Sequence, residues 1–581
     1  MNTKKTIITL LALLCLTTTA MAKKENTVTL RLIETSDVHG AFFPYDFIER
    51  RPMRGTMARV STYLKRQREQ FGQNLILMDN GDILQGQPTC YYTNFVKTDA
   101  PNIAAEVINY LKFDAQTFGN HDVETGHAVY DKWISELQCP TLGANIIDTK
   151  SGKPYVKPYL MLERDGVRIA ILGMLTPAIP NWLPQNLWEG MRFEEMTSSA
   201  RRWVKILREQ EKADAIIGLF HSGWDGGIVT DEYDEDAAKK VAEEVEGFDV
   251  IFYGHDHRAR HEVLPNGVLC LDPSCNAVTV AQATITFKIK DDKKAGRSVE
   301  IVEKKGELVD VTDEEIDEDY MRHFQTQVEG IRTFVERQLG TFAIPMYSRD
   351  AFFGSAAFTD YIHQLQLEHT GADLSFNAPL SFNSVIKAGP IYMSDMFKLY
   401  RFENKIYVLR MTGKEIHNYL EMSYDLWVNT MKTPDDHIML LNEEALNDKQ
   451  RMGFKNFTFN FDSAAGLDYE VDVTKPDGQK VRILQFSDGR PFDENAWYRV
   501  AMNSYRGNGG GELLTRGAGI PMDSLASRIV YMSERDQRHY LTKMIEREGN
   551  VTPKALNNWK FVPEEWVKPA LERDRKLIFG E

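Results

Sequence analysis

Five short polar clusters, each at the end of an apolar run, constrain this chain of 581 residues more than any other feature. The apolar runs are rich in β-branched and aromatic residues, which suit buried strands. Four of the runs occupy residues 29–35, 74–80, 215–221 and 250–255. The polar clusters are Asp37-Val38-His39, Gly81-Asp82, Gly119-Asn120-His121-Asp122, His221 and Gly254-His255-Asp256-His257. Because ligands bind at the carboxyl ends of strands in layered α/β folds, the pattern predicts an α/β fold in which the clusters converge.

The donor atoms in these clusters suit a pair of metal ions. They combine imidazole nitrogen with carboxylate and carboxamide oxygen, a mixture that binds Zn, Mn, Fe or Ni without any thiolate. A phosphoester carries negative charge that repels a nucleophile. Two cations about 3.5 to 4 Å apart clamp its oxygens and lower the pKa of a bridging water toward 7. The sequence therefore predicts two divalent metal ions, of unspecified identity, and hydrolysis of a phosphoester.

Taken singly, each cluster also fits a structural role. An Asp-x-His or Gly-Asp at a strand end is often a turn or a helix cap, and His221 alone could be a satisfied core histidine. The joint occurrence of the clusters, each after a strand-like run, favours the enzyme.

Longer phrases around the clusters resemble a known family. The order DxH, GD, GNH, H and GHxH resembles the calcineurin-like metallophosphoesterases, and residues 78–86 and 117–122 resemble their exported nucleotidase branch. Within that branch, the C-terminal half looks more like the 2′,3′-cyclic-nucleotide 2′-phosphodiesterases/3′-nucleotidases than the 5′-nucleotidase/UDP-sugar hydrolases. The phrases that carry this likeness are residues 398–421, 456–478, 499–512 and 557–561. The resemblance covers roughly residues 28–561 and implies that the substrates are 2′,3′-cyclic nucleotides and 3′-nucleotides, with 5′-nucleotides or UDP-sugars as the alternative.

The same resemblance assigns roles to individual residues. Asp82 bridges the two metals; Asp37, His39 and His257 complete one site, and Asn120, His221 and His255 complete the other. His121 points elsewhere and is free to stabilise or protonate the leaving oxygen. Glu124, where relatives more often have aspartate or asparagine, could orient that imidazole. His127 matches no family position and is expected on the helix that follows.

Substrate recognition is expected from the C-terminal half. The resemblance implies that Phe402 and Tyr505 sandwich the nucleobase, at about 1 to 3 kcal/mol per stacked base, with Asn404 as a small polar neighbour. Phe402 could instead be core packing, and Tyr505 a surface residue beside a turn. The glycines at 507, 509, 510 and 511 suggest a loop that approaches the ligand closely. Residues 376–389 lack the arginine of the Gly-Gly-x-Arg loop of 5′-nucleotidases, which leaves as candidate replacements Arg401, Arg410 and Arg506.

Composition and the resemblance to the family predict the domain organisation. We expect a four-layer sandwich of mixed sheets with helices over residues 26–300, closed by a β-rich segment at 279–289 and followed by a charged, loop-like stretch to 311. A single linker helix is predicted over 310–340, with Thr312 as its cap and Gly340 as its stop. A second α/β domain for nucleotide recognition would span 341–525, and a tail over 526–581 would pack on it with one helix at 536–549.

Charge and the N-terminus indicate partners and location. The formal charge of −15 disfavours duplex nucleic acid as a partner, whereas small nucleotides remain allowed because the metals supply positive charge. Lys4 and Lys5 before the apolar residues 8–20, with cleavage after Ala22, predict a secretory signal peptide over 1–22 and a periplasmic location. No membrane span is expected elsewhere, and a monomer is favoured.

Cysteines and catalytic competence leave two alternatives open. An exported chain permits disulfides, and Cys270 could pair with Cys275 across a loop. The absence of a C-x-x-C pair disfavours a structural zinc. A catalytically silent nucleotide-binding or adhesion protein is the alternative of another class, although a complete ligand set argues against it.

Overall fold

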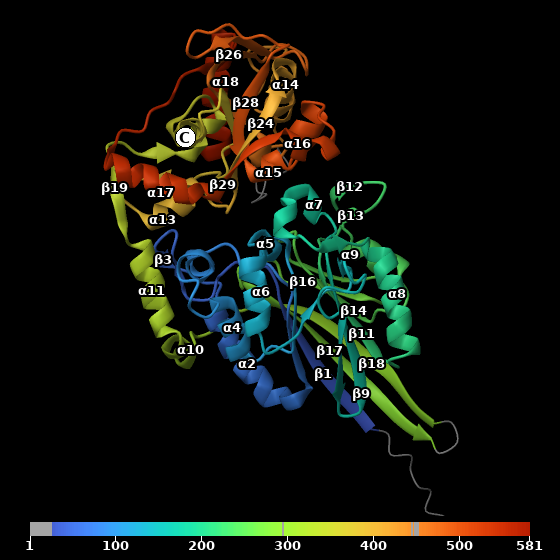
Figure 1. The fold of residues 1–581 in the computed structure, drawn as a ribbon. Coiled ribbons are helices and arrows are strands. Elements are labelled where there is room, and N and C mark those ends of the chain that lie inside the picture. Colours follow the sequence, from blue (N-terminus) through green and yellow to red (C-terminus); the bar gives the residue numbers. More distant parts are fainter. Residues whose placement is uncertain (1–25, 293–295, 443–445, 447–452, 581) are drawn as a thin grey trace, which may run out of the picture.

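The computed structural model describes residues 26–580 except 293–295, 443–445 and 447–452, so the predicted signal segment at 1–22 lies outside the described residues. Two domains lie one above the other, with the N-terminal domain in blue to green and the C-terminal domain in yellow to red (Figure 1). Within the described part, no helix combines the length and apolarity needed to cross a bilayer.

The N-terminal domain is built on two six-stranded mixed sheets. The first sheet has the order β18 (Gly296–Asp310), β17 (Thr279–Asp292), β1 (Asn26–Thr35), β4 (Leu75–Asp79), β5 (Ala115–Thr117) and β6 (Thr141–Leu142). The second has the order β15 (Arg260–Val263), β16 (Leu269–Asp272), β14 (Val250–Tyr253), β11 (Ala215–His221), β9 (Val167–Leu175) and β8 (Tyr159–Arg164). Apolar side chains of both sheets, including Leu32, Ile76, Ile217 and Phe252, form one buried cluster between them.

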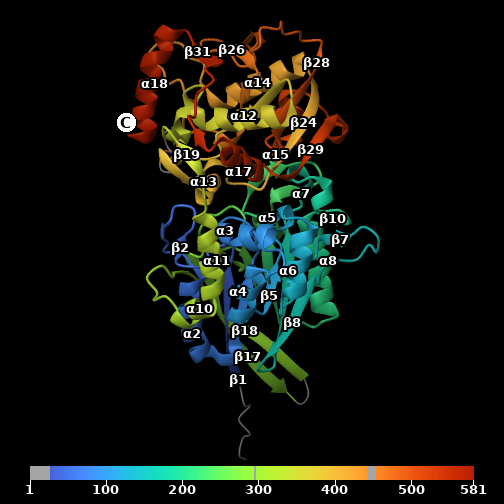
Figure 2. The same ribbon diagram turned by 60° about the vertical axis from the view of Figure 1, so that its left-hand side comes forward.

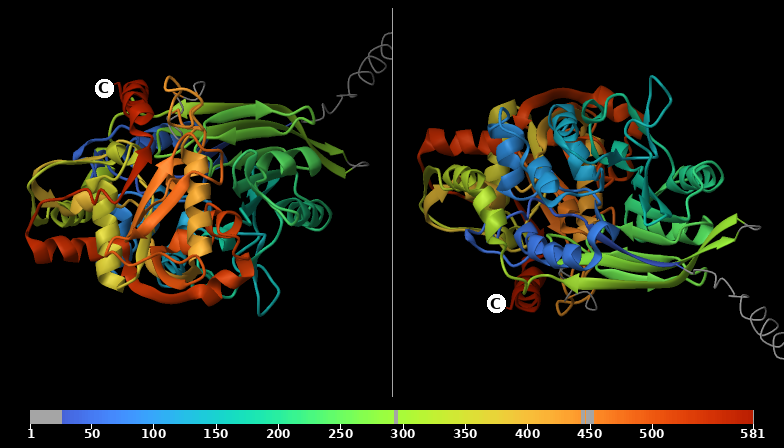
Figure 3. Two further views of the ribbon diagram at one scale, coloured as in Figure 1. Left: turned by 90° about the horizontal axis from the view of Figure 1, so that it is seen from above. Right: turned by 90° about the horizontal axis from the view of Figure 1, so that it is seen from below.

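Helices cover the two outer faces of this sandwich. The first sheet packs against α2 (Met57–Phe71), α4 (Ile103–Leu111) and α6 (His127–Glu136). The second packs against α8 (Met196–Glu209) and α9 (Ala238–Glu244). Seen from below, the blue helices and the green helices lie on opposite sides of the strands (Figure 3). The predicted four-layer sandwich is confirmed.

The strand ends bring the polar clusters together. β1 pairs in parallel with β4 and β4 with β5 in one sheet, and β11 pairs in parallel with β14 in the other. Their carboxyl ends therefore meet at one edge of the sandwich. In Figure 1 this edge, marked by α5 (Asn120–Glu124) and α7 (Ile179–Trp182), faces the C-terminal domain.

Two sequence expectations about the connection between domains are wrong. The stretch expected to be loop-like contains β18, an edge strand that pairs antiparallel with β17. Most of its charged side chains are exposed, which is common on edge strands because charge opposes pairing with other chains, and this charge made the segment resemble a loop. The single linker helix is two helices, α10 (Glu318–His323) and α11 (Gln325–Val335).

The start and stop of that linker also differ from expectation. Asp317, not Thr312, caps α10, because its side chain accepts from the backbone N–H groups of Asp319 and Tyr320. Gly340 lies inside strand β19 (Gln338–Phe342) instead of ending a helix. Figure 2 shows α11 running along the sandwich up to β19 and the C-terminal domain.

The C-terminal domain contains a five-stranded and a three-stranded sheet with helices. The five-stranded sheet has the order β25 (Ser463–Ala465), β21 (Leu374–Asn377), β28 (Trp497–Asn503), β24 (Lys405–Thr412) and β29 (Ile529–Asp536). The three-stranded sheet has the order β27 (Val481–Phe486), β26 (Leu467–Asp472) and β31 (Trp559–Val562). The helices that pack in the cores of this domain include α12 (Ala357–Thr370), α14 (Gly413–Trp427) and α17 (Gln537–Glu548).

The tail holds one helix more than expected. The helix predicted at 536–549 is α17, and α18 (Glu564–Phe579) follows as a second helix. Burial of Val567 and Ala570 anchors α18 on the domain, although Pro569 lies within it and lowers the helical signal of the sequence.

Disulfide pairing does not occur among the described cysteines. Cys90, Cys139, Cys270 and Cys275 are all free thiols. Cys270 lies on β16 and belongs to the apolar core beneath α8 and α9, whereas Cys275 lies in the loop after that strand.

Candidate metal centre and substrate cavity

Four donor residues from three loops converge on one point. Asp37, His39, Asp82 and His257 each offer a ligand atom, and these atoms all lie within 4.8 Å of one another. The Nε2 atoms of His39 and His257 are 3.0 Å apart, and Asp37 Oδ1 lies 3.3 Å from His257 Nε2. Facing imidazole nitrogens and buried carboxylates fit one shared divalent cation.

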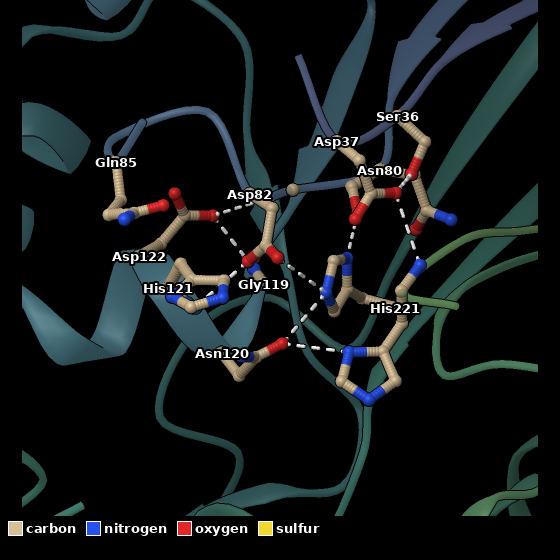
Figure 4. Close-up of polar contacts among 12 residues, drawn as sticks. Ser36, Asp37, Asn80, Asp82, Gln85, Gly119, Asn120, His121, Asp122 and His221 are labelled. Atoms are coloured by element: carbon tan, nitrogen blue, oxygen red, sulfur yellow. Dashed lines mark hydrogen bonds and ion pairs between the residues drawn. The ribbon is translucent and has the colours of Figure 1, made fainter. Parts of the chain in front are cut away.

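A second group of donors lies beside the first and shares Asp82 with it. Asp82, His221 and His255 also place their ligand atoms within 4.8 Å of one another. Asn120 Oδ1 lies 3.1 Å from His221 Nε2 and 2.8 Å from His255 Nδ1. Figure 4 shows Asp37, Asp82, Asn120 and His221 directed toward this common region. The donor chemistry thus fits two divalent cations with Asp82 between them.

Backbone carbonyl groups select the tautomers of two of these histidines. His39 Nδ1 lies 3.1 Å from the carbonyl oxygen of Gln85, and His221 Nδ1 lies 2.7 Å from that of Asn80. A carbonyl oxygen only accepts, so Nδ1 carries the hydrogen and donates. The lone pair of each ring is then on Nε2, which faces the cluster, as metal binding requires.

Backbone strain is concentrated on the same residues. Positive φ angles, which are uncommon outside glycine, occur at five of the seven expected ligands. They are Asp37 (50°), His39 (48°), Asp82 (53°), His255 (85°) and His257 (58°). Each such residue costs on the order of 1 to 3 kcal/mol, and strain of this kind is typical of functional sites.

Two glycines of the polar clusters lie too close to neighbouring side chains to be replaced by a residue with a Cβ atom. A Cβ atom on Gly119 would lie 2.0 Å from Asp82 Oδ1, and one on Gly254 would lie 2.0 Å from Ser36 Oγ. Any larger residue at either position would push the metal-binding loops apart. Steric crowding therefore explains why the GNH and GHxH clusters begin with glycine.

Asp122 is a site residue to which the sequence reasoning gave no role. Its buried carboxylate accepts from the backbone N–H groups of Asp82, Ile83, Leu84 and Gly119, at 2.8 to 2.9 Å. It therefore fixes the Gly-Asp loop to the Gly-Asn-His loop. Burial, and then the charge of Asp82, raise the pKa of Asp122 to about 6. Its position directly after Gly119-Asn120-His121 was the sequence signal that could have revealed this role.

His121 is outside both donor groups and is paired with Glu124. His121 Nδ1 lies 2.7 Å from Glu124 Oε2, and Asn404 of the C-terminal domain donates to Glu124 Oε1 at 3.4 Å. Burial lowers the pKa of His121, but Asp82 and Glu124 outweigh it and raise this pKa to about 9. His127, as expected, is on the next helix, where Nδ1 pairs with Asp131.

One cavity of about 1560 Å³ joins the two domains. His121 and His255 line it from the N-terminal domain, and Phe402, Asn404 and Tyr505 line it from the C-terminal domain. Phe402 and Tyr505 are half-buried. The structure therefore brings the expected recognition residues and the candidate metal centre onto a common space.

The Tyr505 ring is supported by its own loop. A Cβ atom on Gly510 would lie 2.6 Å from that ring, so only glycine lets the ring rest on the loop backbone. Phe459, which also lines the cavity, meets Tyr505 edge to face at 6.2 Å between ring centroids. This aromatic neighbour was not expected from the sequence.

The three arginines suggested as replacements for the missing clamp do not line the cavity. Arg506 is buried and forms an ion pair with Asp462 at 3.0 Å. Its guanidinium also donates to the Gly510 carbonyl, so it stabilises the loop that carries Tyr505. Arg410 lies over the Trp497 ring, and Arg401 lies over the Phe402 ring. Among the described residues, the arginines that line the cavity are Arg258 and Arg535.

Comparison with known proteins identifies both domains. Residues 30–259 match the calcineurin-like phosphoesterase family, and residues 338–516 match the 5′-nucleotidase C-terminal domain. A 2′,3′-cyclic-nucleotide 2′-phosphodiesterase/3′-nucleotidase of Yersinia enterocolitica is 26% identical over 95% of this chain and 91% of its own length. A protein of the same name from Haemophilus influenzae is 25% identical over 94% of this chain and 89% of its own length.

A solved structure shares the whole architecture. A Staphylococcus aureus protein assigned as a 5′-nucleotidase has a TM-score of 0.75 at 21% identity, covering 92% of this chain and 100% of that one. The matches confirm the resemblance and support a metal-dependent phosphoester hydrolase. The chain therefore belongs to the proteins that join a calcineurin-like phosphoesterase domain to a 5′-nucleotidase C-terminal domain.

Proposed function

We propose that this protein is an exported nucleotide phosphohydrolase that uses two divalent metal ions, drawn from Zn, Mn, Fe or Ni. It opens 2′,3′-cyclic nucleotides and then removes phosphate from the resulting 3′-nucleotides. The observation that carries the proposal is the cavity shared by the metal-binding histidines and by Phe402 and Tyr505. The relatives named for this pair of activities, which align over nearly the whole chain, support the choice of substrate.

Different residues would hold the metal ions and bind the base. Asp37, His39 and His257 would hold one cation, Asn120, His221 and His255 the other, and Asp82 both. When bound, such a pair neutralises phosphate charge and lowers the pKa of a water between the ions. Phe402 and Tyr505 would stack on the two faces of the base and so fix which phosphate ester reaches the centre.

We assign to His121 the protonation of the leaving oxygen. In the opening of a 2′,3′-cyclic nucleotide, the oxygen of water bonds to phosphorus, the bond from phosphorus to O2′ breaks, and O2′ takes a proton. Protonated His121 would supply that proton through Nε2, because Nδ1 is occupied by Glu124. Removal of the 3′-phosphate repeats this step at O3′.

A substrate panel tests the proposal. The protein loaded with each candidate metal should hydrolyse 2′,3′-cAMP and 3′-AMP with a kcat/KM at least tenfold above that for 5′-AMP and UDP-glucose. The opposite order would assign the protein to the 5′-nucleotidases. No hydrolysis of any of the four by a protein that binds two metals would indicate a nucleotide-binding protein without catalysis.

Export is tested separately. The proposal rests on the predicted signal segment at residues 1–22. Fractionation of the native host should recover the activity outside the cytoplasm, with a mature N-terminus after Ala22. Recovery of the uncleaved chain in the cytoplasm would contradict it.

A further inference from the structure

His255 is the one histidine of the second donor group whose orientation depends on a side chain. Its Nδ1 atom faces Asn120 Oδ1 at 2.8 Å, on the side of the candidate metal centre. Its Nε2 atom, on the opposite side of the ring, lies 3.2 Å from Glu235 Oε1. A carboxylate that accepts from Nε2–H leaves the lone pair on Nδ1, which is the nitrogen that faces the centre.

Glu235 is itself held in place by the surrounding chain. It belongs to β13 (Asp234–Asp236), which pairs with β12 (Gly226–Val229). Its carbonyl oxygen accepts from Thr176 Oγ1 at 2.9 Å and from Ser222 Oγ at 2.7 Å. Its second carboxylate oxygen accepts from the backbone N–H of Ile228 at 2.6 Å. A Cβ atom on Gly227 would collide with this carboxylate at 2.6 Å, so the hairpin is shaped around it.

The other side-chain neighbours of His255 cannot replace this contact. Asp236 Oδ1 is 3.8 Å from Nε2, beyond hydrogen-bond distance, and accepts from the backbone N–H of Gly223 instead. The Trp182 ring packs against His255 at 5.7 Å between centroids and restricts its tilt without choosing a tautomer. In contrast, His39 and His221 are oriented by backbone carbonyls, which no substitution of a side chain removes directly.

We propose that Glu235 is a positioning residue that fixes the metal-binding tautomer of His255 and thereby sets the affinity of the second metal site. The inference rests on the proposed function for the presence of two cations. It deepens that function by assigning the strength of one site to the β12–β13 hairpin, outside the five sequence clusters. Carboxylates that orient metal-bound histidines typically contribute about 10-fold to 100-fold to affinity.

The decisive variant is Glu235→Gln. A glutamine oxygen can accept from His255 or from Ile228, but its amide group must then face the other N–H as a second donor. Either the hairpin contact is lost, or His255 adopts the tautomer with hydrogen on Nδ1. Matched controls are Glu232→Gln, which removes the same charge from an exposed position of the same hairpin, and Asp236→Asn. Glu235→Asp keeps the charge but shortens the side chain by one methylene, and it is included as a variant of intermediate effect.

The experiment titrates the metal-free full-length protein with Zn²⁺ against a competing chelator and follows two dissociation constants. A Mn²⁺ titration watched by electron paramagnetic resonance reports separately whether a spin-coupled pair or a single ion is bound. For Glu235→Gln we expect one of the two constants to rise about 10-fold to 100-fold and the coupled signal to be replaced by a single-ion signal. The other constant, and both constants of the two control variants, should stay within about threefold of the native values, with Glu235→Asp between.

Two results would overturn the inference. Native affinity for the second ion in Glu235→Gln would show that His255 needs no carboxylate. An equal loss in Glu232→Gln would show that only the charge of the hairpin matters. Retention of the other metal site at native affinity shows that a variant is folded, and Glu235→Asp replaces Glu235→Gln if it is not. Because no substrate is present, failure here is distinct from failure of the substrate panel.

Discussion

The metal loops of the N-terminal domain and the aromatic wall of the C-terminal domain line the same cavity but are built in opposite ways. Of the expected ligands, Asp37, Asp82 and His221 are fully buried, five have a positive φ, and two histidines are fixed by backbone carbonyls. Phe402 and Tyr505 are half-buried. Tyr505 rests on the backbone at Gly510 and meets the Phe459 ring edge to face. Hydrolysis here therefore depends on fixed positions of the donor atoms, whereas base recognition depends on apolar ring faces that tolerate small shifts.

The difference predicts how sharply each region responds to substitution. A change among the ligands should lower the hydrolysis of every substrate, because all of them depend on the same metal centre and both metal sites share Asp82. A change in the aromatic wall should affect only substrates that carry a base. Four predictions, given in order of decreasing effect, test this separation.

The largest effect is expected for Asp82→Asn. Asp82 is common to both donor groups, and an amide cannot supply the charge that two cations require. Hydrolysis of all substrates should be nearly abolished, and metal content per chain should fall at both sites. A variant that retains two metals and near-native turnover would show that Asp82 is not the bridge.

His121→Ala should lower turnover of nucleotides by about 10²-fold or more and leave metal content unchanged. His121 lies outside both donor groups, so its loss removes a proton donor and no ligand. The loss should be smaller for bis(p-nitrophenyl) phosphate, since p-nitrophenolate leaves without protonation. Equal losses for both substrates would assign His121 to charge stabilisation, and loss of a metal would make it a ligand.

Replacing Phe402 or Tyr505 by alanine should raise KM for nucleotides by about 5-fold to 150-fold, the equivalent of 1 to 3 kcal/mol per ring. Hydrolysis of bis(p-nitrophenyl) phosphate should change little, because it has no base to stack. Phe459→Ala, which removes a cavity-lining ring that contacts Tyr505 but is not expected to stack on the base, is the control for general disturbance of the wall. Unchanged KM values in both alanine variants would place the base elsewhere.

The smallest effect is expected for Glu124→Gln, about threefold to tenfold in turnover at neutral pH, below that of His121→Ala. Burial works against the positive charge of His121, but Asp82 and then Glu124 raise its pKa to about 9 in the absence of metals. Cations at Asp82 neutralise part of that effect and bring the pKa down. The proton donor must be protonated, so activity falls as pH rises through this pKa.

Loss of Glu124 removes a further cause of the raised pKa. The alkaline limb of the kcat profile should therefore move to lower pH in Glu124→Gln. Asn404→Ala, which removes the weaker contact to Glu124 at 3.4 Å, should move it less. A limb that stays in place would mean that His121 does not set it.

The N-terminal site was predictable because each ligand residue is dictated by donor chemistry and follows a strand. Asp37, Asp82 and His221 all occur where apolar runs end, and parallel pairing then brings them together. Asp122 and Glu235 were missed because they act by accepting hydrogen bonds, a role that many exposed acidic residues also fit. Only their burial and partners distinguish them, and both are properties of the folded chain.

The errors in the fold have physical causes of the same kind. Charged residues on the solvent side of β18 hid an edge strand, and Thr312 was a plausible cap in competition with Asp317. Arg506 looked like a ligand clamp because it follows Tyr505, yet Asp462 pairs with it inside the domain. In each case a tertiary partner, invisible in the local sequence, decided the outcome.

The separation of chemistry from base recognition is measured by the ratio of kcat/KM for 3′-AMP to that for bis(p-nitrophenyl) phosphate in three proteins: native, His257→Asn and Tyr505→Ala. We expect His257→Asn, which damages the metal centre, to lower both rates and to leave the ratio within about threefold of native. Tyr505→Ala should lower the ratio about 5-fold to 150-fold while retaining the diester rate. An unchanged ratio in Tyr505→Ala, or a ratio that falls as much in His257→Asn, would contradict the separation of chemistry and recognition within one cavity.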